Sequence, residues 1–131
     1  MASGNTHDSS VIVAAIPVGI ISPIAGVSCL VGGLLLSPDI DCKSNPVRRL
    51  KKFPPLYWFW SPWQRFKHRS MWTHFPILCT ALKLTWVLFW LAFVGIATGH
   101  GLGWVLRPEW VSVAIGWAIA DTLHWLLDGC P

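Results

Sequence analysis

The chain has 131 residues, of which 53% are hydrophobic and only 12% charged, and its net charge at pH 7 is +4. Soluble domains carry about 25% charged residues, so this composition argues against a small soluble protein and favours an integral membrane protein. We therefore predict one all-α domain over residues 1–131. It would be a small polytopic membrane protein with three to four transmembrane or re-entrant helices and a basic aromatic loop.

The first apolar stretch, at about residues 10–36, contains no charged residue. As a single helix it would be about 39 Å long, enough to cross a bilayer of roughly 30 Å. However, Ser22 followed by Pro23 is typical of a helix N-cap and a first-turn proline, which would begin a second helix. A single span and a helical hairpin, with arms at about 10–22 and 23–36, both remain open.

The second and third apolar stretches cover about residues 75–98 and 109–127, and each is long enough for a membrane-spanning helix. A proline is tolerated in the first turn of a helix, so Pro76 is compatible with a helix that Thr73 caps. Lys83 lies inside the second stretch. Its amine would either face the protein interior or reach back to the membrane interface.

Residues 37–70 form a basic, aromatic loop between the first two apolar stretches. It holds most of the basic residues of the chain: Lys43, Arg48, Arg49, Lys51, Lys52, Arg65, Lys67 and Arg69. Short loops rich in Lys and Arg stay on the cytoplasmic side of a membrane, so we place residues 42–69 there. The aromatic cluster at 57–63 is typical of the membrane interface, and anionic lipid headgroups are the expected partner. A basic patch with aromatics can also bind nucleic acid, but tryptophans beside apolar spans favour lipid, and no nucleic-acid partner is expected.

Histidines and carboxylates gather at the ends of the apolar stretches. They are His7 and Asp8 before the first stretch, Asp39 and Asp41 after it, His68 and His74 before the second, and Asp121, His124 and Asp128 at the end of the third. If the first stretch is a hairpin, all four groups lie on the side of the basic loop. If it is one span, the first pair lies on the opposite side, and the other three groups still converge. Ionisable groups at the ends of apolar spans are costly and are usually functional.

This convergence predicts a divalent-metal site, because imidazoles and carboxylates from several elements are the usual ligands of such ions. The candidate ligands are His7, Asp8, Asp39, Asp41, His68, His74, Asp121 and His124. They exceed the four to six ligands of one ion, so two or more ions are possible. Simpler explanations exist for each group alone. An Asp-x-Asp after a helix often forms a turn, and Asp121 and His124 could hydrogen-bond to each other on one helix face.

A resemblance to a known family rests on four motifs in a fixed order. They are Thr6-His7-Asp8, Ser37-Pro38-Asp39-Ile40-Asp41, His68-Arg69-Ser70 with Thr73-His74, and Asp121-x-x-His124. Together they resemble a family of small bacterial membrane proteins described as uncharacterised metal-binding proteins. They are also distantly similar to inner-membrane proteins described as metal-dependent hydrolases, and to the zinc-dependent phospholipase C and P1 nuclease group. The resemblance covers essentially the whole chain. It implies a location in the bacterial inner membrane, the eight candidate ligands above, and zinc as the first choice of metal, with manganese or iron as alternatives.

The leading functional hypothesis is metal-dependent hydrolysis of a phosphoester, such as a lipid headgroup. A bound ion would lower the pKa of a water molecule. Asp39 or Asp41 would bridge ions or act as a base, and Arg69 would stabilise charge on the phosphoryl group. The alternative is a non-catalytic metal-binding protein for storage, sensing or structure. A divalent-ion transporter is less favoured, because transport sites usually lie near the membrane midplane. The sequence indicates neither the substrate nor the oligomeric state.

Overall fold

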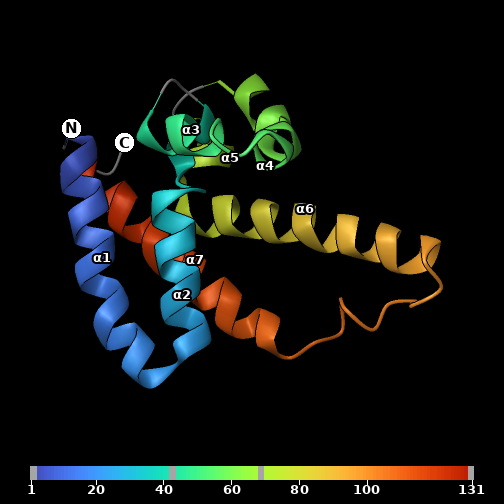
Figure 1. The fold of residues 1–131 in the computed structure, drawn as a ribbon. Helices are drawn as coiled ribbons and strands as arrows, with labels where there is room; N and C mark the ends of the chain where they lie inside the picture. The colour runs from blue at the N-terminus through green and yellow to red at the C-terminus, as the bar shows by residue number, and fades with distance from the viewer. Residues whose placement is uncertain (1–2, 42–43, 68–69, 130–131) are drawn as a thin grey trace.

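The computed structural model describes residues 3–41, 44–67 and 70–129, and these form helices and turns without a β-strand (Figure 1). In chain order the helices are α1 (Gly4–Ile21), α2 (Pro23–Leu34), the 3-10 helix η1 (Pro38–Asp41), α3 (Asn45–Leu50), α4 (Pro54–Trp60), the 3-10 helix η2 (Ser61–Arg65), α5 (Met71–His74), α6 (Pro76–Ala97) and α7 (Glu109–Leu127). The predicted all-α class is confirmed.

The first apolar stretch is a helical hairpin rather than one span, with α1 and α2 running side by side in opposite directions (Figure 1). Ser22 lies between them with an extended backbone, and its Oγ accepts a hydrogen bond from the backbone N–H of Ala25. Pro23 then occupies the first turn of α2. A serine N-cap followed by a proline in the first turn is the pattern that the sequence indicated, and here it begins a second helix that runs antiparallel to the first. The start of α1 therefore lies on the same side as the end of α2.

Glycines allow the backbones of α1, α2 and α7 to approach each other closely. A Cβ on Gly116 of α7 would collide with the carbonyl oxygen of Ala25 and lie 2.8 Å from the backbone nitrogen of Cys29, both in α2. Gly26 of α2 faces Gly19 of α1 in the same way. Small residues at such contacts let helices pack backbone against backbone. The hairpin is thereby fixed against α7, the helix that carries His124 in its last turn.

A separate one-turn helix, α5, precedes α6. The expectation that Thr73 caps the second apolar helix is wrong, because α6 begins at Pro76 and its N-cap residue is Phe75. A proline disfavours helical backbone in the residue before it, and Phe75 is extended, with φ −77° and ψ 119°. The chain therefore bends between α5 and α6, and His74 lies at the end of the shorter helix.

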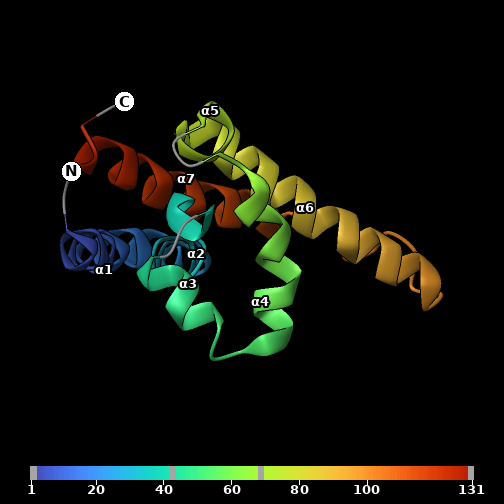
Figure 2. The same cartoon turned by 90° about the horizontal axis from the view of Figure 1, so that it is seen from above.

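The basic loop is folded into short helices. η1, α3, α4 and η2 lie together at the end of the molecule where α1 begins and α7 ends (Figures 1 and 2). Their buried side chains, Ile40, Val47, Leu50, Trp60 and Trp63, form one apolar cluster with Leu36 before η1, Cys79 of α6 and Trp117 of α7. This cluster holds η1, and with it Asp39, against the ends of the long helices.

Two helices of the described part of the chain, α6 with 22 residues and α7 with 19, are long and apolar enough to cross a membrane by length and composition. The apolar helix α2 has only 12 residues. Much of the surface of α6 is apolar and exposed, with Phe89 and Phe93 58% and 57% accessible. Lys83 is the exception on α6, since it faces the protein interior and is completely buried.

Candidate metal centre

Two histidines and two aspartates converge where η1, α5 and the end of α7 meet. Asp39 comes from η1, His74 ends α5, and His124 and Asp128 lie one turn apart at the end of α7. One potential ligand atom from each of the four lies within 4.8 Å of all the others. Three segments far apart in sequence thus contribute to one site.

The spacing of these atoms fits a shared metal ion better than direct hydrogen bonds. The distances are 3.4 Å from His124 Nε2 to Asp39 Oδ1, 3.4 Å from His124 Nε2 to Asp128 Oδ2, and 3.7 Å from His74 Nε2 to Asp39 Oδ1. Ligands about 2.0–2.1 Å from a tetrahedral ion lie roughly 3.3–3.4 Å apart, whereas hydrogen bonds are usually shorter than about 3.2 Å. Nε2 of His124 is buried and has no hydrogen-bond partner among the described residues. A cation between these groups would supply the missing interaction.

Neighbouring hydroxyls contact the second nitrogen of each histidine. Ser37 Oγ lies 3.3 Å from Nδ1 of His124, and Thr73 Oγ1 lies 3.1 Å from Nδ1 of His74. Outer contacts of this kind fix the orientation and the tautomer of ligating histidines. Both rings therefore present Nε2 to the same point.

The charge state of Asp39 also suits a ligand. Burial by itself would raise the pKa of its carboxyl group, but the nearby imidazoles of His124 and His74 outweigh burial and hold the pKa below its usual value. The carboxylate is therefore ionised at neutral pH, which is the form that binds a metal.

The sequence model of the family described as uncharacterized metal-binding protein (DUF2227) matches residues 2–131 of this chain. The chain belongs to this family. Searches among curated proteins and among solved structures found no match. The family description and the His/Asp cluster agree on metal binding, and they support the coarser part of the resemblance seen in the sequence.

In this family member His7 lies beside the four-residue cluster. Its Nε2 is 3.2 Å from Oδ1 of Asp128, and its ring stacks on that of His124 with a centroid separation of 4.2 Å. Burial, and then the proximity of His124, lower the pKa of His7 despite the neighbouring carboxylates. The structure thus places His7 against two of the cluster residues, where it orients Asp128.

Asp8, another residue predicted as a ligand, has a different partner. Arg49 of α3 donates from Nη1 to its Oδ1 at 3.0 Å and from Nη2 to its Oδ2. The same guanidinium donates to the carbonyl oxygen of Leu34 at 2.9 Å. Two parallel N–H groups match a carboxylate well, so the Asp8–Arg49 pair joins the start of α1 to α3, and Arg49 also joins α3 to the end of α2.

Asp121 also lies outside the four-residue cluster, although it shares a helix face with His124. It is completely buried, and it accepts hydrogen bonds from Lys83 Nζ and Thr80 Oγ1, both at 2.6 Å. A buried carboxylate needs such partners. The structure therefore places Asp121 in an ion pair with α6, one turn deeper than the cluster.

The side chains of the remaining predicted site residues lie outside the part of the chain that the structure describes. Arg69 and His68 fall in the gap at 68–69, and the side chain of Asp41 is also not described. Conversely, Asp128 belongs to the cluster but was not among the predicted ligands. Asp128 could have been identified from its spacing of four residues from His124, since residues four apart on a helix lie on one face.

Proposed function

We propose that this protein is an integral membrane protein that binds one divalent transition-metal ion through Asp39, His74, His124 and Asp128. The observation that carries the proposal is the spacing of the candidate ligand atoms: Nε2 of His124 lies 3.4 Å from an oxygen of each carboxylate, and Nε2 of His74 lies 3.7 Å from Oδ1 of Asp39. Zinc is the first choice because two imidazoles and two carboxylates suit a tetrahedral ion, and the same ligands also accept manganese or iron. A second ion would draw on Asp41 and His68.

A membrane location is proposed from α6 and α7, whose length and composition suit a bilayer. The exposed apolar surface of α6 would otherwise be in contact with water, which is unfavourable. With α1 and α2 as a hairpin, the metal ligands and the basic segment lie at one end of the molecule (Figure 1). From the excess of Lys and Arg we infer that this end faces the cytoplasm and that the membrane is the bacterial inner membrane.

The second candidate function is metal-dependent hydrolysis of a phosphoester, such as a lipid headgroup. It is favoured by the Asp39 side chain, which keeps 25% of its surface accessible, so solvent reaches the cluster. A bound divalent ion would supply Lewis-acid and water-activating chemistry. Asp39 would hold the ion, Asp41 would accept a proton, and Arg69 would bind the phosphoryl group. A fully closed four-ligand site would instead have a structural role.

Metal analysis of detergent-purified protein tests the site. Wild-type protein is expected to retain about one ion per chain, while His124→Ala and Asp39→Ala lose it. His100→Ala is the matched control, because His100 is exposed and lies in the turn after α6. A wild-type protein without metal, or a His124→Ala variant that retains it, would refute the proposal.

Two further measurements test the membrane location and the hydrolytic activity. Resistance to alkaline carbonate extraction, with release by detergent, is expected of an integral membrane protein, and release by carbonate alone would contradict the membrane location. Metal-loaded protein would then be incubated with phosphodiester and phospholipid substrates, before and after chelation. Turnover that disappears with chelation and in Asp39→Ala supports hydrolysis. No turnover on any substrate favours the non-catalytic role.

A further inference from the structure

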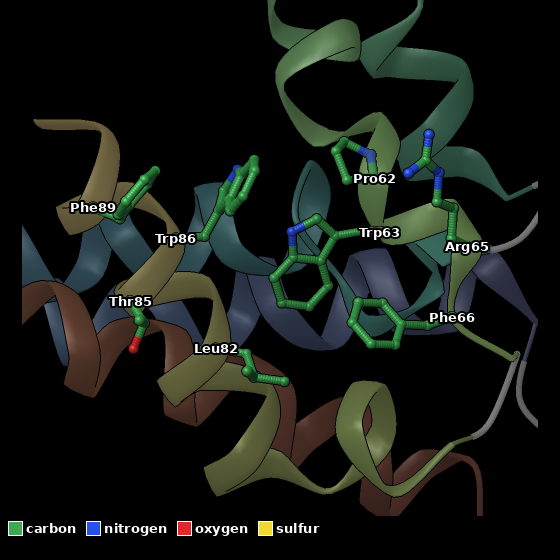
Figure 3. A pocket seen from close by; sticks show the side chains of 8 residues that line it. All are labelled: Pro62, Trp63, Arg65, Phe66, Leu82, Thr85, Trp86 and Phe89. Atoms are coloured by element: carbon green, nitrogen blue, oxygen red, sulfur yellow. The ribbon is translucent and has the colours of Figure 1, made fainter. Parts of the chain in front are cut away.

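A cavity of about 560 Å³ lies between the segment that includes η2 and the middle of α6 (Figure 3). It is lined by Pro62, Trp63, Arg65 and Phe66 on one side and by Leu82, Thr85, Trp86 and Phe89 on the other. Small-molecule sites typically measure about 300–1,000 Å³ and are mostly apolar. The size and the lining are those of a ligand site rather than a packing defect.

Two local features shape this cavity. The α6 residues are spaced at i, i+3, i+4 and i+7, so they form one face of the helix. On the other side Trp63 is buried in the core cluster, and the ring of Phe66 stands 5.8 Å from it at a tilted angle. The wall is therefore fixed by the core, while Phe66 and Phe89 keep 40% and 58% of their surface accessible. An apolar surface of this kind favours an apolar occupant.

The described lining of the cavity has few polar side chains, and one of them is basic. Among the described residues that line it, only Arg65 and Thr85 carry polar side-chain groups besides the indole N–H groups, and none carries a carboxylate. Arg65 lies at one edge next to Pro62 (Figure 3) and makes no ion pair among the described residues. Arg65 is exposed, as is the nearby Lys67. The cavity thus combines an apolar interior with a positively charged edge.

We propose that this cavity binds one anionic phospholipid, with an acyl chain between η2 and α6 and the phosphate on Arg65. An acyl chain needs no hydrogen bonds, whereas a bound peptide would bring backbone groups that this lining cannot satisfy. A guanidinium is well suited to phosphate because it donates two parallel hydrogen bonds. The inference rests on the proposed membrane location of α6, which would bring lipid to the cavity.

The test uses the full-length protein in detergent, with bound lipids counted by native mass spectrometry. The probes are phosphatidylglycerol and phosphatidylcholine of identical acyl chains. Wild-type protein is expected to bind one phosphatidylglycerol about fivefold more tightly than phosphatidylcholine, since one basic residue near a membrane surface contributes about that factor. Arg65→Gln is expected to remove this preference and keep weak binding of both lipids. Lys67→Gln is the charge control, because Lys67 does not line the cavity.

Thr85→Trp tests the cavity itself, because an indole at this exposed position of α6 would fill it. Binding of both lipids is expected to fall at least tenfold. Ala81→Trp, at an exposed site on the same helix but outside the lining, is the matched control. Circular dichroism checks that each variant remains helical. If Thr85→Trp does not fold, Phe89→Ala is used in its place, with the same expected direction.

Equal binding of the two lipids by wild-type protein, or wild-type affinity in Thr85→Trp, would overturn the proposal. Displacement of the lipid by an apolar helical peptide that binds more tightly would also overturn it, in favour of a protein partner. Carbonate extraction distinguishes a failure of the proposed lipid site from a failure of the proposed membrane location. Protein that resists extraction but shows no cavity-dependent binding refutes the lipid site alone, and protein that is released by carbonate yet binds lipid refutes the membrane location alone.

Discussion

The Nζ atom of Lys83 lies 2.6 Å from Oδ1 of Asp121, and both side chains are completely buried. The same amine donates to the carbonyl oxygen of Leu36 at 2.9 Å. Leu36 precedes Asp39 by three residues, and Asp121 precedes His124 by one helical turn. The ion pair therefore connects α6 to two of the three segments that carry candidate metal ligands, η1 through Leu36 and α7 through Asp121.

Lys83→Met is expected to destabilise the protein by about 3–5 kcal/mol, because it leaves the charge of Asp121 buried without its cation. The double variant Lys83→Met/Asp121→Leu removes both charges and is expected to recover part of this loss. Denaturant unfolding in detergent, followed by circular dichroism, measures the difference. Lys52→Met, at an exposed site, is the control. A double variant no more stable than the single one would argue against this account.

Asp128→Asn is expected to lower metal affinity at least tenfold, whereas Asp8→Asn leaves it within about twofold. The reason is that Asp128 faces His124 across 3.4 Å, while Asp8 is engaged by Arg49. Titration with zinc in the presence of a competing chelator measures both affinities. The Asp8 variant should lose stability instead, because its removal breaks the link between α1 and α3. The reverse pattern, with Asp8 rather than Asp128 needed for metal, would restore the ligand set predicted from sequence.

His7→Phe is expected to reduce metal affinity about 10- to 100-fold without changing the number of ions bound. The phenyl ring preserves stacking on His124 but cannot contact Asp128, so that carboxylate loses its orienting partner. Zinc stoichiometry and affinity are measured separately. Complete loss of the ion would show that His7 is itself a ligand.

Removal of the metal is expected to lower the unfolding temperature of the wild-type protein. At a free metal concentration a thousandfold above the dissociation constant, binding to the folded state contributes about 4 kcal/mol. Because the candidate ligands come from η1, α5 and α7, a bound ion would join segments distant in sequence. Unfolding is compared before and after chelation, with His124→Ala as the variant that should not respond. An equal response of both proteins would place the metal elsewhere.

Gly116→Ala is expected to destabilise the protein by about 1–3 kcal/mol, because the added methyl group meets the backbone of α2 and the helices must separate. Gly103→Ala is a suitable control, since its nearest neighbour to a Cβ lies at 3.7 Å, an ordinary contact. Denaturant unfolding in detergent again gives the comparison. Equal stability of the two variants would show that α2 and α7 tolerate a wider separation.

Several elements could be predicted from local sequence. The third apolar stretch, at about 109–127, coincides with α7, and the second, at about 75–98, differs from α6 by one residue at each end. Ser22 and Pro23 signalled the hairpin, although the length of the stretch also allowed one span. These features depend on hydrophobic runs, caps and prolines, which act over a few residues. The break between α5 and α6 also had a local cause, in the effect of Pro76 on the residue before it.

The sequence alone determined that this chain is helical, apolar and supplied with histidines and aspartates at its helix ends. The tertiary structure decided which of those groups meet. Asp8, Asp121 and Asp128 are chemically equivalent in the sequence, yet one lies against Arg49, one against Lys83 and one against His124. A carboxylate is stabilised by whichever cation packing brings within about 4 Å. That distance depends on contacts between segments tens of residues apart, which no local pattern in the chain encodes.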